Sequence, residues 1–145
     1  MDLKSGYPFW AIKNGLMCAF PQLQADISCD VVVVGGGITG SLIADELTTH
    51  GFDVVVVEQR DIGWGSSAAS TALLQYEIDT HMVDLATMYG ETQAVLAYKA
   101  CAAAITDIGK LANELGDVDF SMQHSLYYAS KRSDKTALRE EYLLR

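Results

Sequence analysis

Two copies of the sequence Asp-Val-Val-Val-Val, at residues 30–34 and 53–57, constrain the fold of this chain more than any other feature. A run of four β-branched residues is typical of a short strand that is buried on both faces of a parallel sheet. Between the copies, Gly51 is placed to end a helix, whose apolar residues recur at helical spacing: Ile38, Leu42, Ile43 and Leu47. The segment therefore predicts a strand, a tight turn, a helix and a second strand parallel to the first.

The two predicted strands end in different residues. The first runs into a G-x-G-x-x-G pattern at Gly35, Gly37 and Gly40. In this pattern the glycines permit a sharp turn, the close approach of a pyrophosphate and close packing of the helix on the sheet, while the helix N-terminus faces the phosphates. The second strand runs into Glu58, 18 residues beyond Gly40, where a carboxylate can accept hydrogen bonds from a ribose. Phosphate and sugar contacts at neighbouring strand ends predict a dinucleotide site.

The composition narrows the class of protein. The chain has 145 residues, of which 50% are hydrophobic, enough for about one domain. Its net charge of −9 argues against nucleic acid and anionic membranes as partners, because both attract clustered Lys and Arg. No apolar run approaches the roughly 18 residues of a membrane span and no signal peptide is evident, so we expect a cytoplasmic protein without a transmembrane segment. Three widely spaced cysteines, Cys18, Cys29 and Cys101, indicate free thiols rather than a metal site.

The remainder of the chain alternates between loops and predicted helices. Residues 1–29 form an arm with aromatic and proline anchors, which we expect to pack over the fold that follows. Residues 61–79 begin as a loop rich in glycine and serine and continue as a short strand or extended segment. Helices are predicted from residue 82 to near Gly90, from there to Gly116, and from residue 133 onward, and short strands are predicted at residues 119–120 and 125–129.

The stretches DVVVVGGGITG and VVVVEQRDIGWGSSAAS, with the spacing between them, resemble the FAD-dependent oxidoreductases of the D-amino-acid oxidase type. This family includes glycine oxidase, sarcosine oxidase and γ-glutamylputrescine oxidoreductase, and the amino-terminal arm looks like that of the last branch. The resemblance implies an α/β fold, with a Rossmann-like FAD-binding parallel sheet and flanking helices, followed by the start of a mixed α+β substrate domain. It divides the chain into the arm at residues 1–29, an incomplete FAD-binding domain at residues 30–116 and a truncated substrate domain at residues 117–145.

The resemblance also assigns roles to single residues. The glycine turn contacts the pyrophosphate, Glu58 and Gln59 face the adenosine ribose, a Gly-Ser-Ser loop returns to the phosphates, and a small-residue stretch follows the flavin ring. The implied cofactor-binding residues are Gly35, Gly37, Ile38, Thr39, Gly40, Glu58, Gln59, Gly65, Ser66, Ser67, Thr71, Ala72 and Leu73. Ala69 stands where some family members carry a histidine that tethers the flavin, so we expect non-covalent FAD. His81, the next histidine downstream, is expected at the surface or at a helix cap.

The resemblance implies an activity as well. We expect oxidation of the C–N bond of an amino acid or secondary amine by hydride transfer to flavin, with the catalytic residues still to be identified. An NAD-dependent dehydrogenase is an alternative, against which the loop at residues 62–70 argues, because a nicotinamide fold has no evident use for it. A non-catalytic FAD-binding subunit is the other alternative. His124, with Tyr127 and Tyr128, belongs either to an ordinary strand pair, which we favour, or to a substrate pocket.

The last residues combine mixed charge with a helical pattern. Lys131, Arg132, Lys135 and Arg139, set against Glu140 and Glu141, are typical of an exposed helix. The pattern runs to residue 144 without a terminating glycine, and the family fold needs later strands. We therefore expect the 145 residues to be a fragment that holds the ADP-binding corner and is inactive alone.

Overall fold

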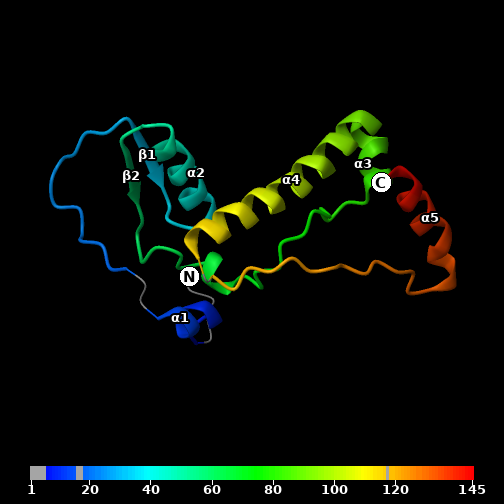
Figure 1. The fold of residues 1–145 in the computed structure, drawn as a ribbon, viewed down its shortest axis with the longest axis horizontal. Coiled ribbons are helices and arrows are strands. Elements are labelled where there is room, and N and C mark those ends of the chain that lie inside the picture. The colour runs from blue at the N-terminus through cyan, green and yellow to red at the C-terminus, as the bar shows by residue number, and fades with distance from the viewer. Residues whose placement is uncertain (1–5, 16–17, 117) are drawn as a thin grey trace. The chain divides into compact units, whose positions relative to one another are not determined.

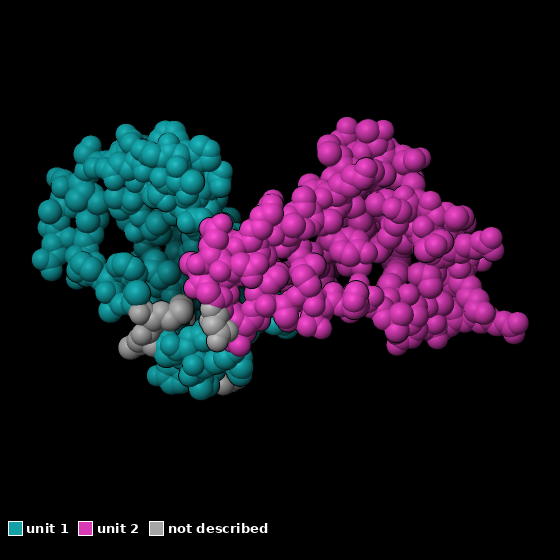
Figure 2. Space-filling model, viewed as in Figure 1, with its two compact units in different colours: residues 1–72 teal, residues 73–145 magenta. Residues whose placement is uncertain are grey.

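The computed structural model describes residues 6–15, 18–116 and 118–145 (Figure 1). Its elements, in chain order, are α1 (Phe9–Asn14), β1 (Val31–Val34), α2 (Ile38–Thr49), β2 (Val54–Val57), the 3₁₀ helix η1 (Ser67–Ala69), α3 (Met82–Tyr89), α4 (Glu91–Leu115), the 3₁₀ helix η2 (Arg132–Asp134) and α5 (Lys135–Leu144). The chain divides into two compact units, residues 1–72 and 73–145 (Figure 2). Residue 117, where the substrate domain is predicted to begin, lies outside the described residues.

The first unit contains the predicted βαβ segment. β1 and β2 pair in parallel with Val31 opposite Val54, so the two copies of the sequence Asp-Val-Val-Val-Val lie in register. The aspartates that precede the two strands also bond to each other. Asp53 N donates to the Asp30 carboxylate over 2.9 Å, and Asp30 N donates to the Asp53 carbonyl over 3.0 Å. Within the described residues the sheet has these two strands alone. The parallel βαβ unit is confirmed, and the larger Rossmann-like sheet stays a prediction.

The predicted helices of both units end at their expected glycines. α2 is followed by Gly51, whose N–H donates to the Thr48 carbonyl over 2.9 Å and whose φ of +85° lies in the region that favours glycine. α3 ends at Gly90 and α4 at Gly116. These helix limits follow from local sequence, since apolar periodicity and a terminating glycine act within a few residues of each other.

The amino-terminal arm contains a short helix, α1, that its sequence pattern does not predict. The helix has six residues, fewer than two turns, which is too few for helical periodicity to show. Trp10 Nε1 donates to the Ser70 carbonyl over 2.8 Å, and the rings of Tyr7 and Trp64 meet edge to face with centroids 6.3 Å apart. Tyr7 and Trp10 therefore contact the loop that follows β2, whereas Phe20 and Leu23, farther along the arm, are exposed.

The second unit is built on α3 and α4. Met82, Ala94 and Tyr98 form its buried core, and the Tyr98 hydroxyl donates to the Thr80 carbonyl over 2.9 Å. Burial raises the pKa of Tyr98 above its usual value, and the negative charge of Glu141 adds to this effect. The second unit is therefore organised around the helices α3 and α4 and the buried side chain of Tyr98, whereas the first unit is organised around a sheet.

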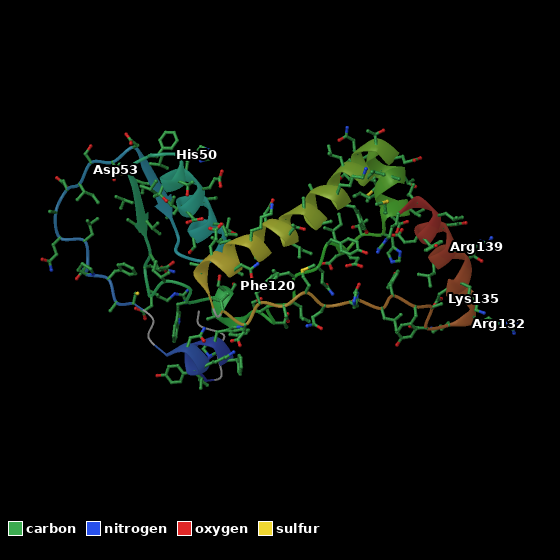
Figure 3. The ribbon with its side chains drawn as sticks, viewed as in Figure 1. His50, Asp53, Phe120, Arg132, Lys135 and Arg139 are labelled. Atoms are coloured by element: carbon green, nitrogen blue, oxygen red, sulfur yellow. The ribbon has the colours of Figure 1, made fainter. Side chains whose placement is uncertain are left out.

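The short strands predicted at residues 119–120 and 125–129 are not formed. The structure has no strand in the described residues after β2, and residues 118–129 run as an extended segment. A strand needs the N–H and C=O groups of a neighbouring strand, and no described strand lies alongside this segment to supply them. Phe120 instead sets its ring against α4, where a Cβ at Gly109 would lie 3.0 Å from the ring (Figure 3).

Glu141 belongs to the predicted helix of mixed charge, but it is buried and not exposed as predicted. Its side chain is 1% exposed, and the carboxylate accepts hydrogen bonds from Met82 N at 2.9 Å, Val83 N at 3.0 Å and Arg145 Nε at 2.8 Å. His81 is the N-cap residue of α3 but makes no side-chain cap bond. Burial by itself raises the pKa of Glu141, but the two backbone N–H groups and the Arg145 guanidinium outweigh burial and hold the pKa below its usual value. Glu141 thus caps α3 from another helix.

Glu141→Ala is expected to destabilise the second unit by about 3 kcal/mol, because it leaves two N–H groups and a guanidinium without their acceptor. The neighbouring exposed residue supplies the control, since Glu140→Ala removes the same charge from the same helix. Because the folded pKa of Glu141 is lowered, its contribution is complete above the unfolded pKa of about 4.3 and is lost as pH falls through the folded value. Urea unfolding of both variants at neutral pH and near pH 3 measures this contribution to stability. Equal unfolding midpoints of Glu141→Ala and Glu140→Ala at neutral pH would contradict the capping role.

Candidate cofactor site

Backbone contacts shape the glycine turn after β1. Gly35 N donates to the Val57 carbonyl over 2.8 Å, and Gly35 then takes a φ of +106°, which L side chains rarely adopt. Gly40 lies in the first turn of α2, where a Cβ would run into the Gly35 carbonyl and lie 3.3 Å from Val33 Cγ1. The first glycine therefore makes the turn, and the third lets the helix press against it.

Gly37 differs from the other two glycines. It is the N-cap residue of α2 with ordinary extended backbone, φ −81° and ψ −176°. A Cβ there would have one neighbour within 4 Å, Ser67 Oγ at 3.2 Å. The same Ser67 hydroxyl accepts a hydrogen bond from Ile38 N over 2.9 Å. An oxygen thus already faces the N-terminus of α2, where the helix dipole favours an anionic oxygen.

The loop of residues 61–70 returns to the glycine turn. Gly63 N donates to the Gly36 carbonyl over 2.7 Å, which fixes the loop beside the turn. η1 follows and carries Ser67, while Ser66 is exposed next to it. Gly65 lies beneath the Arg60 side chain, since a Cβ at Gly65 would be 3.0 Å from Arg60 Nη2. The loop thus brings the Ser67 hydroxyl to the turn, and the Arg60 guanidinium lies over the loop at Gly65.

Glu58 is tied to the turn by both carboxylate oxygens. Oε2 accepts a hydrogen bond from Gly36 N over 2.8 Å, and Oε1 accepts one from Arg60 N over 3.0 Å. The Gly36 N–H, with a smaller effect from the Arg60 N–H, holds the pKa of Glu58 below its usual value. The carboxylate therefore remains ionised and positions Gly36, between the first two glycines of the pattern. Sequence spacing places Glu58 at the strand end but does not reveal this contact.

Sequence reasoning also misses Arg60. Its guanidinium is placed over Gly65 by the turn after β2, and its position two residues after Glu58 is the one signal in the sequence that it stands near the predicted sugar site. Among the predicted residues, Thr39, Gln59 and Thr71 are exposed. The Gln59 backbone N–H contributes to holding the Glu58 carboxylate ionised, whereas the side chains of Thr39 and Thr71 make no hydrogen bond to the turn within the described residues.

The predicted flavin stretch, residues 71–73, is not drawn into the turn. Ala72 takes a φ of +57°, which is uncommon for a residue with a side chain, and its N–H donates to Ser70 Oγ over 3.1 Å. Leu73 is the first residue of the second unit and is 74% exposed. The structure thus brings together the predicted phosphate and ribose residues, whereas the flavin contacts of residues 71–73 stay predictions.

Residues 6–15, 18–116 and 118–145 hold no group of three or more His, Cys, Asp or Glu side chains placed to bind a metal ion. The same residues include no helix long and apolar enough to span a membrane.

A family model described as FAD dependent oxidoreductase, named DAO, matches residues 30–145. The chain belongs to the DAO family. FAD is therefore the cofactor of this DAO protein, which favours the FAD prediction over the NAD-dependent alternative. The turn fits that cofactor, because the Ser67 hydroxyl, the group nearest to a Cβ at Gly37, already bonds Ile38 N as a phosphate oxygen would.

Curated relatives match parts of this DAO chain. YhfW of Bacillus subtilis, which carries the name of a Rieske 2Fe-2S iron-sulfur protein, is 37% identical over 106 residues, 73% of this chain and 21% of that protein. The γ-glutamylputrescine oxidoreductase of Escherichia coli is 38% identical over 78 residues, 52% of this chain and 18% of that enzyme. The aerobic glycerol-3-phosphate dehydrogenase of Staphylococcus epidermidis is 47% identical over 49 residues, 34% of this chain and 9% of that enzyme. The chain thus spans about a fifth or less of the length of these relatives. No solved structure matches it.

Proposed function

We propose that this protein binds FAD non-covalently at the turn between β1 and α2 and oxidises the C–N bond of an amine or amino acid. FAD, when bound, supplies the acceptor for a hydride from the carbon beside the nitrogen. The observation that carries the proposal is the convergence of Gly37, Ser67 and Glu58 at the N-terminus of α2. Open backbone, a hydroxyl and a carboxylate are the groups that a pyrophosphate and a ribose require.

Each residue at the turn has its own task in this proposal. Gly37 leaves room for the pyrophosphate, and Ile38 N exchanges the Ser67 hydroxyl for a phosphate oxygen. Ser66 and Ser67 then donate their hydroxyl hydrogens to the phosphates. Glu58 accepts from the ribose hydroxyls, and Arg60 adds positive charge beside the loop. The stretch 71–73 follows the flavin ring, within an FAD-binding domain of residues 30–116 and ahead of a substrate domain that begins near residue 117.

The choice of an amine rests on the lengths of the matches. The match to γ-glutamylputrescine oxidoreductase covers 78 residues, whereas the match to aerobic glycerol-3-phosphate dehydrogenase covers 49. Of these two relatives, whose names state a substrate, the amine enzyme thus matches the larger part of this chain, 52% against 34%. Oxidation of a polyol phosphate is the second candidate, and the higher identity of the shorter match, 47% against 38%, favours it.

Anaerobic titration of the FAD-loaded protein decides between these substrates. Flavin absorbance in the visible should bleach with primary or secondary amines and stay constant with glycerol 3-phosphate. Bleaching by glycerol 3-phosphate but not by amines would contradict amine oxidation and identify a polyol phosphate as the substrate class. A flavin that no substrate of either class reduces would support the non-catalytic alternative.

Glu58→Gln should weaken FAD binding about tenfold, because an amide is a poorer acceptor for ribose hydroxyls and for Gly36 N than an ionised carboxylate. Glu46→Gln is the matched control, since Glu46 lies exposed on α2 in the same unit. The dissociation constant of FAD, measured by quenching of flavin fluorescence, gives the result. An unchanged constant in Glu58→Gln would show that the carboxylate serves neither the ribose nor the turn.

A further inference from the structure

A groove of about 710 Å³ lies beside α5 in the second unit. Its lining consists of three tyrosines (Tyr76, Tyr127 and Tyr142), three cations (Lys135, Arg139 and Arg145), Leu138 and the buried Glu141. Its volume falls in the range of roughly 300–1,000 Å³ that small-molecule sites occupy. We call it the tyrosine groove. It belongs to one compact unit, so its lining does not depend on the arrangement of the two units.

The three cations of the tyrosine groove are not equivalent. Arg145 is balanced, because it lies 2.8 Å from a Glu141 oxygen and 3.3 Å from a Glu77 oxygen. Its guanidinium also lies over the Tyr127 ring at 5.6 Å. The side chains of Lys135 and Arg139, in contrast, have no hydrogen bond or ion pair with any residue in the described part of the chain. Two charges on the wall of the groove are therefore available to a ligand.

Helix stability does not explain these two cations. Lys135 is the first residue of α5, at the end of the helix where the dipole disfavours positive charge. Arg139 follows one turn later, and like charges four residues apart repel each other on a helix. Arg132, just before α5, lies on the same side as Lys135 and Arg139 (Figure 3). A basic stripe of this kind, in a chain of net charge −9, is accounted for by an anion that binds to it.

The tyrosine rings favour a small organic anion over a polymer. Tyr142 is 78% exposed, and Tyr127 is 50% exposed although the Arg145 guanidinium lies over its ring, so both aromatic side chains offer surface beside the cations. An apolar body would cover the parts of these rings that Arg145 leaves free, while its anionic group pairs with Lys135 and Arg139. A polyanion such as nucleic acid would instead meet the negative charge of the remainder of the chain.

We propose that the tyrosine groove binds a small organic anion, a carboxylate or phosphate ester with an apolar body. Lys135 and Arg139 hold the anionic group, and Tyr127 and Tyr142 contact the body. The site is separate from the glycine turn, and the proposal does not depend on amine oxidation.

Calorimetric titration of the purified protein tests the charge requirement. Benzoate and phenyl phosphate serve as anionic probes, and benzamide is a neutral probe of the same shape as benzoate. Benzoate should bind more tightly than benzamide, and Lys135→Gln/Arg139→Gln should weaken benzoate about tenfold. Lys99→Gln/Lys110→Gln removes the same charge from exposed positions on α4 and should leave the affinity unchanged.

Tyr142→Ala tests the apolar contact, because it should weaken phenyl phosphate while inorganic phosphate binds as before. Equal binding of benzoate and benzamide would overturn the proposal, and so would equal losses in the two double variants or no binding of either anionic probe. Polyglutamate binding that depends on Lys135 and Arg139, without benzoate binding, would assign the stripe to an acidic macromolecule instead. The readout is heat of binding, so a failure of amine oxidation leaves each of these outcomes interpretable.

Discussion

Replacing Gly40 by Ala should destabilise the first unit by about 3 kcal/mol, a change at the upper end of typical overpacking costs. A Cβ at this position would run into the Gly35 carbonyl, which is backbone and part of the turn, and would lie 3.3 Å from Val33 Cγ1. The turn cannot move aside without breaking the bond from Gly35 N to the Val57 carbonyl. The variant should therefore lose both stability and flavin.

The direction of this effect is diagnostic. In an exposed helix, Gly→Ala stabilises by about 0.5–1 kcal/mol, so helix propensity and tertiary packing predict opposite signs at Gly40. Urea unfolding followed by tryptophan fluorescence reports on this unit, because both Trp10 and Trp64 belong to it. Ser41→Ala, at the next and exposed position of α2, is the control that should leave the midpoint nearly unchanged. A raised midpoint in Gly40→Ala would refute the close contact between helix and turn.

Gly37→Val should give a folded protein that no longer binds FAD, with the affinity reduced by more than about 100-fold, a loss of about 2.7 kcal/mol. The backbone of Gly37 suits any residue, and its Cβ would have Ser67 Oγ as its sole neighbour within 4 Å. The branched side chain would, however, fill the space before Ile38 N where we propose the pyrophosphate.

The pair of variants separates the two uses of glycine at this turn. Gly40→Ala should lower the unfolding midpoint, whereas Gly37→Val should leave it near the parent value and remove the flavin. Unfolding curves and flavin content of the same preparations give both results. If Gly37→Val purifies with full flavin content, the pyrophosphate lies elsewhere.

Local sequence determined much of the first unit and the helices of the second. The repeated sequence Asp-Val-Val-Val-Val specified two parallel strands, because four β-branched residues and a short helical connection leave few other arrangements. Apolar periodicity and the glycines at residues 51, 90 and 116 set the ends of α2, α3 and α4. The glycine pattern and Glu58 likewise predict a nucleotide turn, because their spacing reflects geometry within one βαβ unit.

Tertiary structure alone decided the remainder. Glu141 reads as an exposed helical charge, yet its partners are backbone N–H groups at Met82 and Val83, 59 and 58 residues away. Residues 125–129 carry a strand pattern but form no ladder, because a strand depends on a neighbour that its own sequence cannot specify. Lys135 and Arg139 resemble any solvated charges until the fold sets three tyrosines beside them. Periodicity and spacing describe what a segment is able to form, whereas burial, pairing and charge balance depend on which distant segment packs against it.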